Sequence, residues 1–166
     1  MSAAPKENFN PLFDKRLIAA FVDGVVKVMK TMANTDASVG KPYIEKNFTV
    51  KGDIAGMVGM VAPPLKGTLL ITYKQDAIVH ILENMMGEQY SELNQEVVDA
   101  VGEITNMIYG AAKATLNQLG YNFEMAIPSV IRGDFIITRS DKGATLVIPF
   151  NLKDDKVFYV EITVQQ

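Results

Sequence analysis

The segment from residue 94 to 120 has a helical repeat and two faces of opposite character, so the fold must provide a layer for it to pack on. Apolar residues recur every three or four positions, the spacing that brings side chains to one face of an α-helix. They are Val97, Val101, Ile104, Ile108, Ala111 and Leu119. The opposite face carries Asp99, Glu103, Asn106, Gly110 and Lys113. We expect the first face to pack on a core and the second to be available to a partner.

Two glycines, Gly102 and Gly110, interrupt this helix beside its polar face. Each costs about 1 kcal/mol relative to alanine inside a helix, and close approach of another backbone is the usual reason for one. Asn106 is also a mediocre helix former, because its amide competes for nearby backbone groups. A face that only meets water is the alternative, but such a face would favour Glu, Lys or Gln. The composition indicates a docking surface without naming the partner.

Three residues of the polar face have a spacing that resembles a known signature. Three residues separate Asp99 from Glu103, two separate Glu103 from Asn106, and Pro128 follows after 21 more. This pattern resembles that of the CheC, CheX and FliY family of chemotaxis phosphatases, in which the Pro lies about one position later. The resemblance extends over the whole chain and is greatest to CheX-like members. It implies an α+β fold in which two long helices, related by a pseudo-two-fold, pack on an antiparallel sheet.

The rest of the sequence offers no obvious nucleophile or metal site. There is no cysteine, which excludes a thiolate nucleophile and a Cys-bound metal. His80 is the only histidine, and without a second His or Cys we expect it to be structural. Neither a GxGxxG loop nor a Walker-type loop occurs, and no Ser, His and acid constellation stands out. An amide and a carboxylate without a nucleophile suit the positioning of water against an electrophile that is already activated.

The family resemblance implies what that electrophile is. It implies that the chain hydrolyses the aspartyl phosphate of a CheY-like response regulator, with Asn106 orienting the attacking water and Glu103 pairing with the regulator's active-site Lys. Amide nitrogen is not basic, so Asn106 would act through geometry. The regulator would supply Mg²⁺, and this chain would bind no cofactor. The further candidates for partner binding are Asp99, Gly102, Gly110 and Lys113. Asp99 could instead complement the helix dipole.

Two other functions remain open. The chain could be an adaptor that binds a receiver domain or flagellar protein without hydrolysis, or a structural dimer whose polar stripe meets water. The presence of both Glu103 and Asn106 favours the phosphatase, because an adaptor has no need of that pair. The resemblance to CheX-like chains also implies a homodimer that pairs sheet edges. The strand expected at the C-terminus is the candidate edge, unless it is buried within one subunit.

Length and composition fit a single domain, which we expect to span residues 1–166 with a flexible segment at residues 1–12. With 48% apolar residues, the chain can bury a proper core. A net charge of −3 without a basic run disfavours a nucleic-acid partner. The polar N-terminal sequence lacks the apolar stretch of a signal peptide, and no run of 18 apolar residues follows. We therefore expect a cytoplasmic protein without a membrane partner.

The other elements follow from local signals. Asp14 is expected to cap a first amphipathic helix that ends near Asn34. A helix is expected over residues 75–86, ended by Gly87, and Ser91 is expected to cap the helix of the polar stripe. Strands are expected over residues 46–61, 67–73, 123–133, 134–139, 144–152 and 156–164.

The two halves of the sequence share a plan of a long helix followed by strands. VKGDI at residues 50–54 also echoes IRGDF at residues 131–135. This offset places the counterparts of Glu103 and Asn106 at Val22 and Val25, and an offset that allows for the longer first loop places them near Leu17 and Ala20. All four are apolar. The first helix should therefore carry no working site, which leaves one site per chain.

Overall fold

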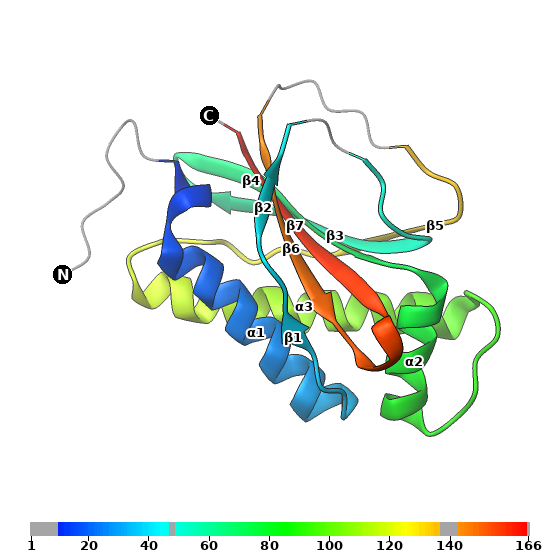
Figure 1. Cartoon of the computed structure of the whole chain (residues 1–166). Helices are drawn as coiled ribbons and strands as arrows, with labels where there is room; N and C mark the ends of the chain where they lie inside the picture. Colours follow the sequence, from blue (N-terminus) through cyan, green and yellow to red (C-terminus); the bar gives the residue numbers. More distant parts are fainter. Residues whose placement is uncertain (1–9, 47–48, 137–142, 166) are drawn as a thin grey trace.

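A computed structural model describes residues 10–46, 49–136 and 143–165 of the protein. The chain forms two layers, in which the helices cover one face of a seven-stranded antiparallel sheet (Figure 1). The two longest helices lie side by side against the sheet and pack on each other. The predicted α+β class is confirmed.

The helices are α1 (Lys15–Ala33), α2 (Gln75–Met86) and α3 (Gln95–Gln118), with short 3-10 helices η1 (Pro11–Phe13) and η2 (Lys153–Asp155). The strands are β1 (Ser38–Val39), β2 (Tyr43–Glu45), β3 (Ile54–Ala62), β4 (Leu65–Tyr73), β5 (Ser129–Arg132), β6 (Thr145–Asn151) and β7 (Val157–Gln165). Their order in the sheet is β1-β6-β7-β4-β3-β5, and β2 also pairs with β6.

The sheet joins two similar halves across its centre. The β3–β4 hairpin of the first half meets the β6–β7 hairpin of the second along β4 and β7, where Leu70 pairs with Glu161. The short strands are exchanged, because β2 pairs with β6 of the other half and β5 pairs with β3. Each half contributes one long helix to the same face. This arrangement is the predicted pseudo-two-fold.

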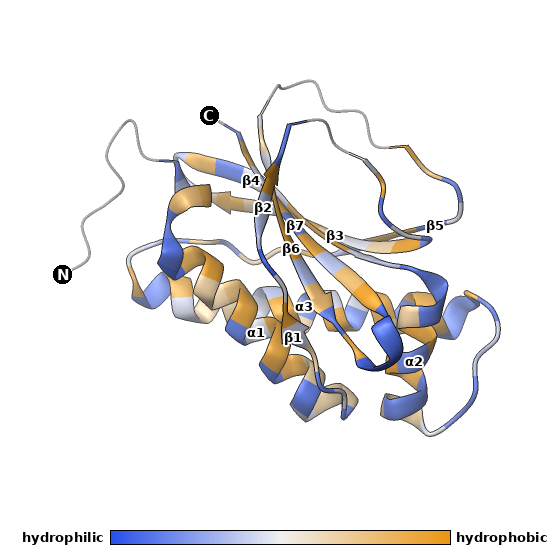
Figure 2. Cartoon of the chain, in the orientation of Figure 1, coloured by the Kyte–Doolittle hydropathy of each residue, from blue (hydrophilic) through white to orange (hydrophobic). Residues whose placement is uncertain are grey.

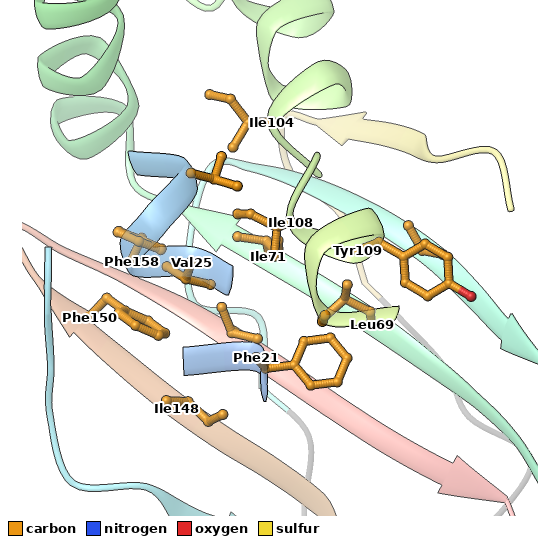
Figure 3. Packing of buried hydrophobic residues seen from close by; sticks show 14 of the residues in the cluster. Phe21, Val25, Leu69, Ile71, Ile104, Ile108, Tyr109, Ile148, Phe150 and Phe158 are labelled. Carbon is orange, nitrogen blue, oxygen red and sulfur yellow. The ribbon is translucent and has the colours of Figure 1, made fainter. Parts of the chain in front are cut away.

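The core lies between the long helices and the central strands (Figure 3). Val25 of α1 and Ile108 of α3 are both fully buried, as are Ile71 of β4 and Phe158 of β7. The Phe158 ring stacks on that of Phe150, with centroids 5.2 Å apart. In Figure 2, apolar and polar residues alternate along α1 and α3, as they must in helices that bury one side only.

α1 begins and ends where local signals predict. The carboxylate of Asp14 accepts a hydrogen bond from the backbone N–H of Arg16, at 2.9 Å, and Asn34 ends the helix in the left-handed conformation. The chain just before α1 differs from expectation. Residues 10–12 were placed in a flexible segment, but Leu12 is buried in the core with 3% of its surface exposed. Residues 1–9 lie outside the described ranges.

The predicted cap of α3 is wrong by three residues. Asn94 is the N-cap, and its side-chain oxygen accepts a hydrogen bond from the N–H of Val97 at 3.0 Å. The Ser91 carbonyl instead accepts a hydrogen bond from the Gln75 side chain at the start of α2. The apolar face is also rotated slightly near the end of the helix. Ala111 and Leu119 are only partly buried, and the fully buried positions are those of Ala112 and Leu116.

The strand predictions are accurate for β4, β6 and β7 and poorer elsewhere. β6 and β7 lie within a residue or two of their predicted bounds, whereas the strand predicted over 46–61 begins only at Ile54. The strand predicted over 123–133 is reduced to β5. Residues 134–136 form no strand, and the rest of the one predicted over 134–139 lies outside the described ranges. β1 and β2 were missed, because each is only two or three residues long.

The prediction that the C-terminal strand is a sheet edge is wrong. β7 pairs with β4 on one side and with β6 on the other, so its backbone groups are used within the subunit. The edges of the sheet are β5 at one end and the short β1 and β2 at the other. Any pairing between copies of this chain has to use those strands.

The predicted offset between the two halves is also wrong. VKGDI leads into β3, whereas IRGDF leads out of β5, so the two segments are not structural counterparts. The burial pattern gives a better alignment of α1 with α3. Its matched buried pairs are Leu17 with Val101, Ala20 with Ile104, Phe21 with Thr105, Gly24 with Ile108 and Val28 with Ala112. In this register the counterparts of Glu103 and Asn106 are Ala19 and Val22, which are again apolar.

Candidate active site

The polar stripe of α3 lies on the side of the helix that faces away from the core. Asp99, Glu103 and Asn106 are exposed, whereas Val101 and Ile104 are fully buried. Residues three apart on a helix are neighbours, with Cβ atoms about 5–6 Å apart. The Glu103 carboxylate and the Asn106 carboxamide therefore leave the helix together, toward solvent.

The two side chains have no partner within the part of the chain that the structure describes. Neither Glu103 nor Asn106 forms a hydrogen bond or an ion pair there through its side chain. Asp99 differs, because its carboxylate accepts a hydrogen bond of 2.8 Å from the side chain of Gln95, one turn earlier. Asp99 also lies in the second turn of the helix, near the positive end of the helix dipole. The carboxylate of Asp99 is thus partly engaged within its own helix.

The two glycines of α3 have different surroundings. A Cβ added to Gly102 would lie 3.4 Å from Val130 of β5, whereas one added to Gly110 would meet nothing within 4 Å. Close approach of two helix backbones occurs instead at Gly24 of α1, where a Cβ would lie 3.5 Å from the carbonyl oxygen of Ile108. Packing within the described chain therefore partly explains why position 102 is a glycine, because Gly102 lies against β5. It does not explain the glycine at Gly110.

Lys113, the last residue of the predicted stripe, lies farther along α3. It is partly buried, and it forms no ion pair within the described ranges. Ten residues of helix place it about 15 Å from Glu103 along the axis. The structure therefore puts Lys113 on the same helix as the exposed pair, but not beside it.

A buried threonine fixes the inner side of α3 between the two exposed residues. The Thr105 hydroxyl donates to the carbonyl oxygen of Val101 at 2.7 Å, and its side chain lies directly over Gly56 of β3. A Cβ on Gly56 would lie 2.9 Å from the Thr105 Cβ, so only glycine allows this contact. Sequence reasoning missed this pair. Its only signal was one polar residue on the apolar face of the helix and one glycine in a strand.

The segment that leads into β5 runs along α3 beside the exposed pair. The Tyr109 hydroxyl donates to the carbonyl oxygen of Glu124 at 2.6 Å, and Val130 contacts Gly102. Pro128 lies between Glu124 and Val130 in the sequence of this segment. Burial, helped by the charge of Glu124, raises the pKa of Tyr109, so the phenol remains a donor at neutral pH. The helix is thus held on both its inner side and one flank.

The acidic and histidine side chains of the described ranges are dispersed. No group of three His, Asp or Glu side chains there converges so that it could hold a metal ion. His80, on α2, is partly exposed and has its Nε2 atom 3.4 Å from the side-chain nitrogen of Asn84. Of the helices in these ranges, none combines the length and apolarity that crossing a bilayer requires.

Two features characterise this protein. The first is an exposed carboxylate and carboxamide on a firmly held helix, an arrangement that suits action on a reactive group carried by a partner. The second is a two-layer fold in which the short strands β2 and β5 each pair with the other half.

The family model described as chemotaxis phosphatase CheX matches residues 54–151, which include the whole motif from Asp99 to Pro128. A CheC-like superfamily protein from Shewanella sp. PV-4 is 38% identical, with a TM-score of 0.84 over 93% of this chain and 100% of that one. The CheY-P phosphatase CheX of Thermotoga maritima is 22% identical over 153 residues, which are 92% of this chain and 97% of that protein. The chain therefore belongs to the CheX family of chemotaxis phosphatases, and its predicted enzyme class is confirmed.

A further structure has the same fold. It is the complex of CheX with CheY, BeF₃ and Mg²⁺ from Borrelia burgdorferi, whose matched chain is 24% identical to this one. The TM-score is 0.77, over 90% of this chain and 98% of that one. At this identity the comparison establishes the fold.

Proposed function

We propose that this chain hydrolyses the aspartyl phosphate of a phosphorylated CheY-like response regulator, with Asn106 and Glu103 as the working pair. The observation that carries the proposal is their joint exposure on α3, without a partner in the described part of a phosphatase-family chain. Side chains in that state can enter a concave site on another protein. The name of the Thermotoga relative and the CheX–CheY complex from Borrelia support this choice of substrate.

Asn106 would position the attacking water. A carboxamide carries both a donor and an acceptor, so it can hold a water molecule in one orientation, but it is too weak a base to take a proton. The water oxygen attacks phosphorus in line with the aspartyl oxygen. The P–O bond to that oxygen then breaks, which regenerates the carboxylate and releases inorganic phosphate, and the surplus proton passes to solvent. Orientation of the nucleophile supplies the rate enhancement.

Glu103 would anchor the regulator by pairing with its active-site Lys, and the regulator's own acidic pocket would hold Mg²⁺. This chain would then bind no cofactor. Breaking a desolvated charge pair at an interface costs about 2–5 kcal/mol, so loss of Glu103 should weaken docking strongly. The contact surface around the pair would comprise Asp99, Gly102, Gly110 and Lys113.

Each chain would carry one such site. Ala19 and Val22 occupy the positions of α1 that correspond to Glu103 and Asn106, and neither can orient water or pair with a Lys. The outer side of α1 therefore lacks the chemistry, although its inner side packs as α3 does.

The protein would act in the cytoplasm as a homodimer that pairs sheet edges, and the β5 edge is the better candidate. The segment before β5 exposes 88% of Met125 and 92% of Ile127. Apolar side chains beside an unpaired edge favour association. Sedimentation equilibrium at micromolar concentrations should detect a dimer, and Ile127→Lys should shift it toward monomer. A wild-type protein that stays monomeric would contradict this part of the proposal.

The central experiment follows loss of acyl phosphate from a CheY-type receiver domain phosphorylated with acetyl phosphate and Mg²⁺. Asn106→Ala should bind the receiver but reduce turnover about 100-fold, the usual effect of removing one positioned polar group. Glu103→Ala should weaken binding as well. Gln118→Ala, at another exposed position of α3, is the matched control and should behave as wild type.

The outcomes separate the candidate functions. If the wild-type protein binds the receiver without shortening the life of the phosphate, the chain is an adaptor. If Asn106→Ala hydrolyses as fast as wild type, the site assignment is wrong. If the protein neither binds the receiver nor hydrolyses its phosphate, the remaining candidate is a structural dimer.

A further inference from the structure

Gly110 lowers the stability of α3, and no contact within the described ranges offsets the loss. It follows Asn106 by one turn and Glu103 by two, so all three lie on one side of α3. Its backbone is helical, unlike Gly87 and Gly120, which have positive φ values. A Cβ there would meet nothing within 4 Å. Neither backbone conformation nor a described neighbour therefore requires glycine at this position.

Contacts within the chain explain the other glycines in or beside α3. Gly56 makes room for Thr105, Gly24 lets α1 approach the backbone of α3, and Gly102 lies against Val130. At Gly110 the same cost of about 1 kcal/mol relative to alanine is not offset by any such contact among the residues that the structure describes. A reason outside the chain would account for it.

Building on the proposed function, we propose that the main chain of the phosphorylated regulator packs directly on the helix backbone at Gly110. Asn106 has a short side chain, in which Cγ is already the amide carbon, so the helix has to come close to the phosphoryl pocket. A methyl group one turn away would hold the partner off the helix. Glu103 is longer by one methylene group and can adapt to a small displacement, whereas Asn106 cannot. Gly110 would thus set the depth at which the working pair enters the pocket.

The charges of the neighbouring residues agree with this occupant. Asp99 and Glu103 are both exposed carboxylates on the same side of α3. The active-site Lys at the receiver's phosphoryl pocket presents a positive charge to such a surface. The proposal commits to the rim of that pocket as the partner of Gly110, rather than to a second copy of this chain.

The test is Gly110→Ala, assayed with a CheY-type receiver domain phosphorylated by acetyl phosphate and Mg²⁺. We expect KM for the phosphorylated receiver to rise about ten-fold, as one misplaced methyl group at a packed contact can cause. The melting temperature should stay the same or rise, because alanine is the better helix former. Gly110→Leu should have the larger effect on KM. Thr115→Ala, which strengthens the same helix five residues on and away from the stripe, should leave KM unchanged.

Binding of the receiver loaded with beryllofluoride, measured by calorimetry, separates this inference from the proposed function. If wild type binds but does not hydrolyse, the proposed reaction fails, and a ten-fold weaker binding of Gly110→Ala still supports docking at Gly110. If Gly110→Ala hydrolyses and binds as wild type does, the inference is wrong and the proposed function stands. A wild-type protein that does not bind would overturn both.

Discussion

α1 and α3 occupy equivalent places in the two halves of the molecule, and they share a burial pattern on the side that faces the sheet but carry different chemistry on the opposite side. The buried positions of their inner sides coincide, as in the pairs Ala20 with Ile104 and Val28 with Ala112. On the outer side, α3 carries Glu103 and Asn106 where α1 carries Ala19 and Val22. The common packing fixes the fold, and the outer side of one helix is free to carry function.

This division explains how one fold can accommodate a site in one half only. Side chains on the inner side are constrained by close packing, where even one methylene group matters. Side chains on the outer side contact little of their own chain, so their replacement costs little stability. The consequences can be tested by comparing matched substitutions in the two halves.

The largest expected effect is on the inner side. Phe21→Ala removes a ring that is 99% buried in α1, and we expect the free energy of unfolding to fall by about 3–5 kcal/mol. Asn106→Ala should change it by less than about 0.5 kcal/mol, because its side chain is exposed. Urea denaturation measures both. A loss of several kcal/mol in Asn106→Ala would mean that the outer side of α3 is structural.

The next effect concerns the centre of the sheet, where Leu70 of the first half pairs with Glu161 of the second. Glu161 is buried, and neither oxygen of its carboxylate has a hydrogen-bond partner in the described ranges. The Nζ atom of Lys51 lies 3.8 Å from Oε1. Burial raises the pKa of Glu161 to about 7; the charge of Lys51 opposes the shift, and that of Glu45 adds to it.

A raised pKa means that the folded state keeps a proton that the unfolded state releases. The free energy of unfolding should therefore fall as pH rises from about 4.5 to about 7, by roughly 3 kcal/mol, and level off above that. Glu161→Gln should remove this slope. Denaturation at pH 5 and pH 8 measures it for both proteins. Equal slopes in the two would show that Glu161 does not titrate in this range.

The smallest effect compares the two helix caps. Asp14 caps α1 and also accepts a hydrogen bond of 2.7 Å from the Tyr121 hydroxyl, whereas Asn94 caps α3 alone. We expect Asp14→Ala to cost about 2 kcal/mol and Asn94→Ala about 1 kcal/mol. Thermal denaturation should rank them. Equal losses would mean that the contact with Tyr121 contributes nothing.

The two caps also differ in their dependence on pH. Burial by itself would raise the pKa of Asp14, but hydrogen bonds from Arg16 and Tyr121 outweigh it and lower the pKa. The stabilisation by Asp14 is therefore present near neutral pH and is lost as pH falls through its lowered pKa. Asp14→Asn should keep the cap and lose this dependence on acid.

The sequence predicted those features of the structure that depend on a few neighbouring residues, namely the ends of α1 and the exposed face of α3. Asp14 and Asn34 bound α1 because a cap depends on the few residues around it, and the helical spacing placed Glu103 and Asn106 outside for the same reason. The cap of α3 was misplaced because Ser91 and Asn94 both fit the local rule, and only packing chose between them. The order of strands depends on pairing between distant segments, so a last strand with an apolar pattern gave no sign that it lies between β4 and β6. The contact between Thr105 and Gly56 could not be predicted for the same reason, because it joins segments that are far apart in the sequence.

The central claim is that a phosphorylated receiver meets the outer side of α3 and not that of α1. Backbone amide chemical shifts, recorded by NMR while a beryllofluoride-loaded CheY-type receiver is added, test it most directly. We expect the largest changes between Asp99 and Lys113, and small ones over the outer residues of α1, including Ala19 and Asp23. Changes that centre on α1, or that are spread evenly over both helices, would contradict the account.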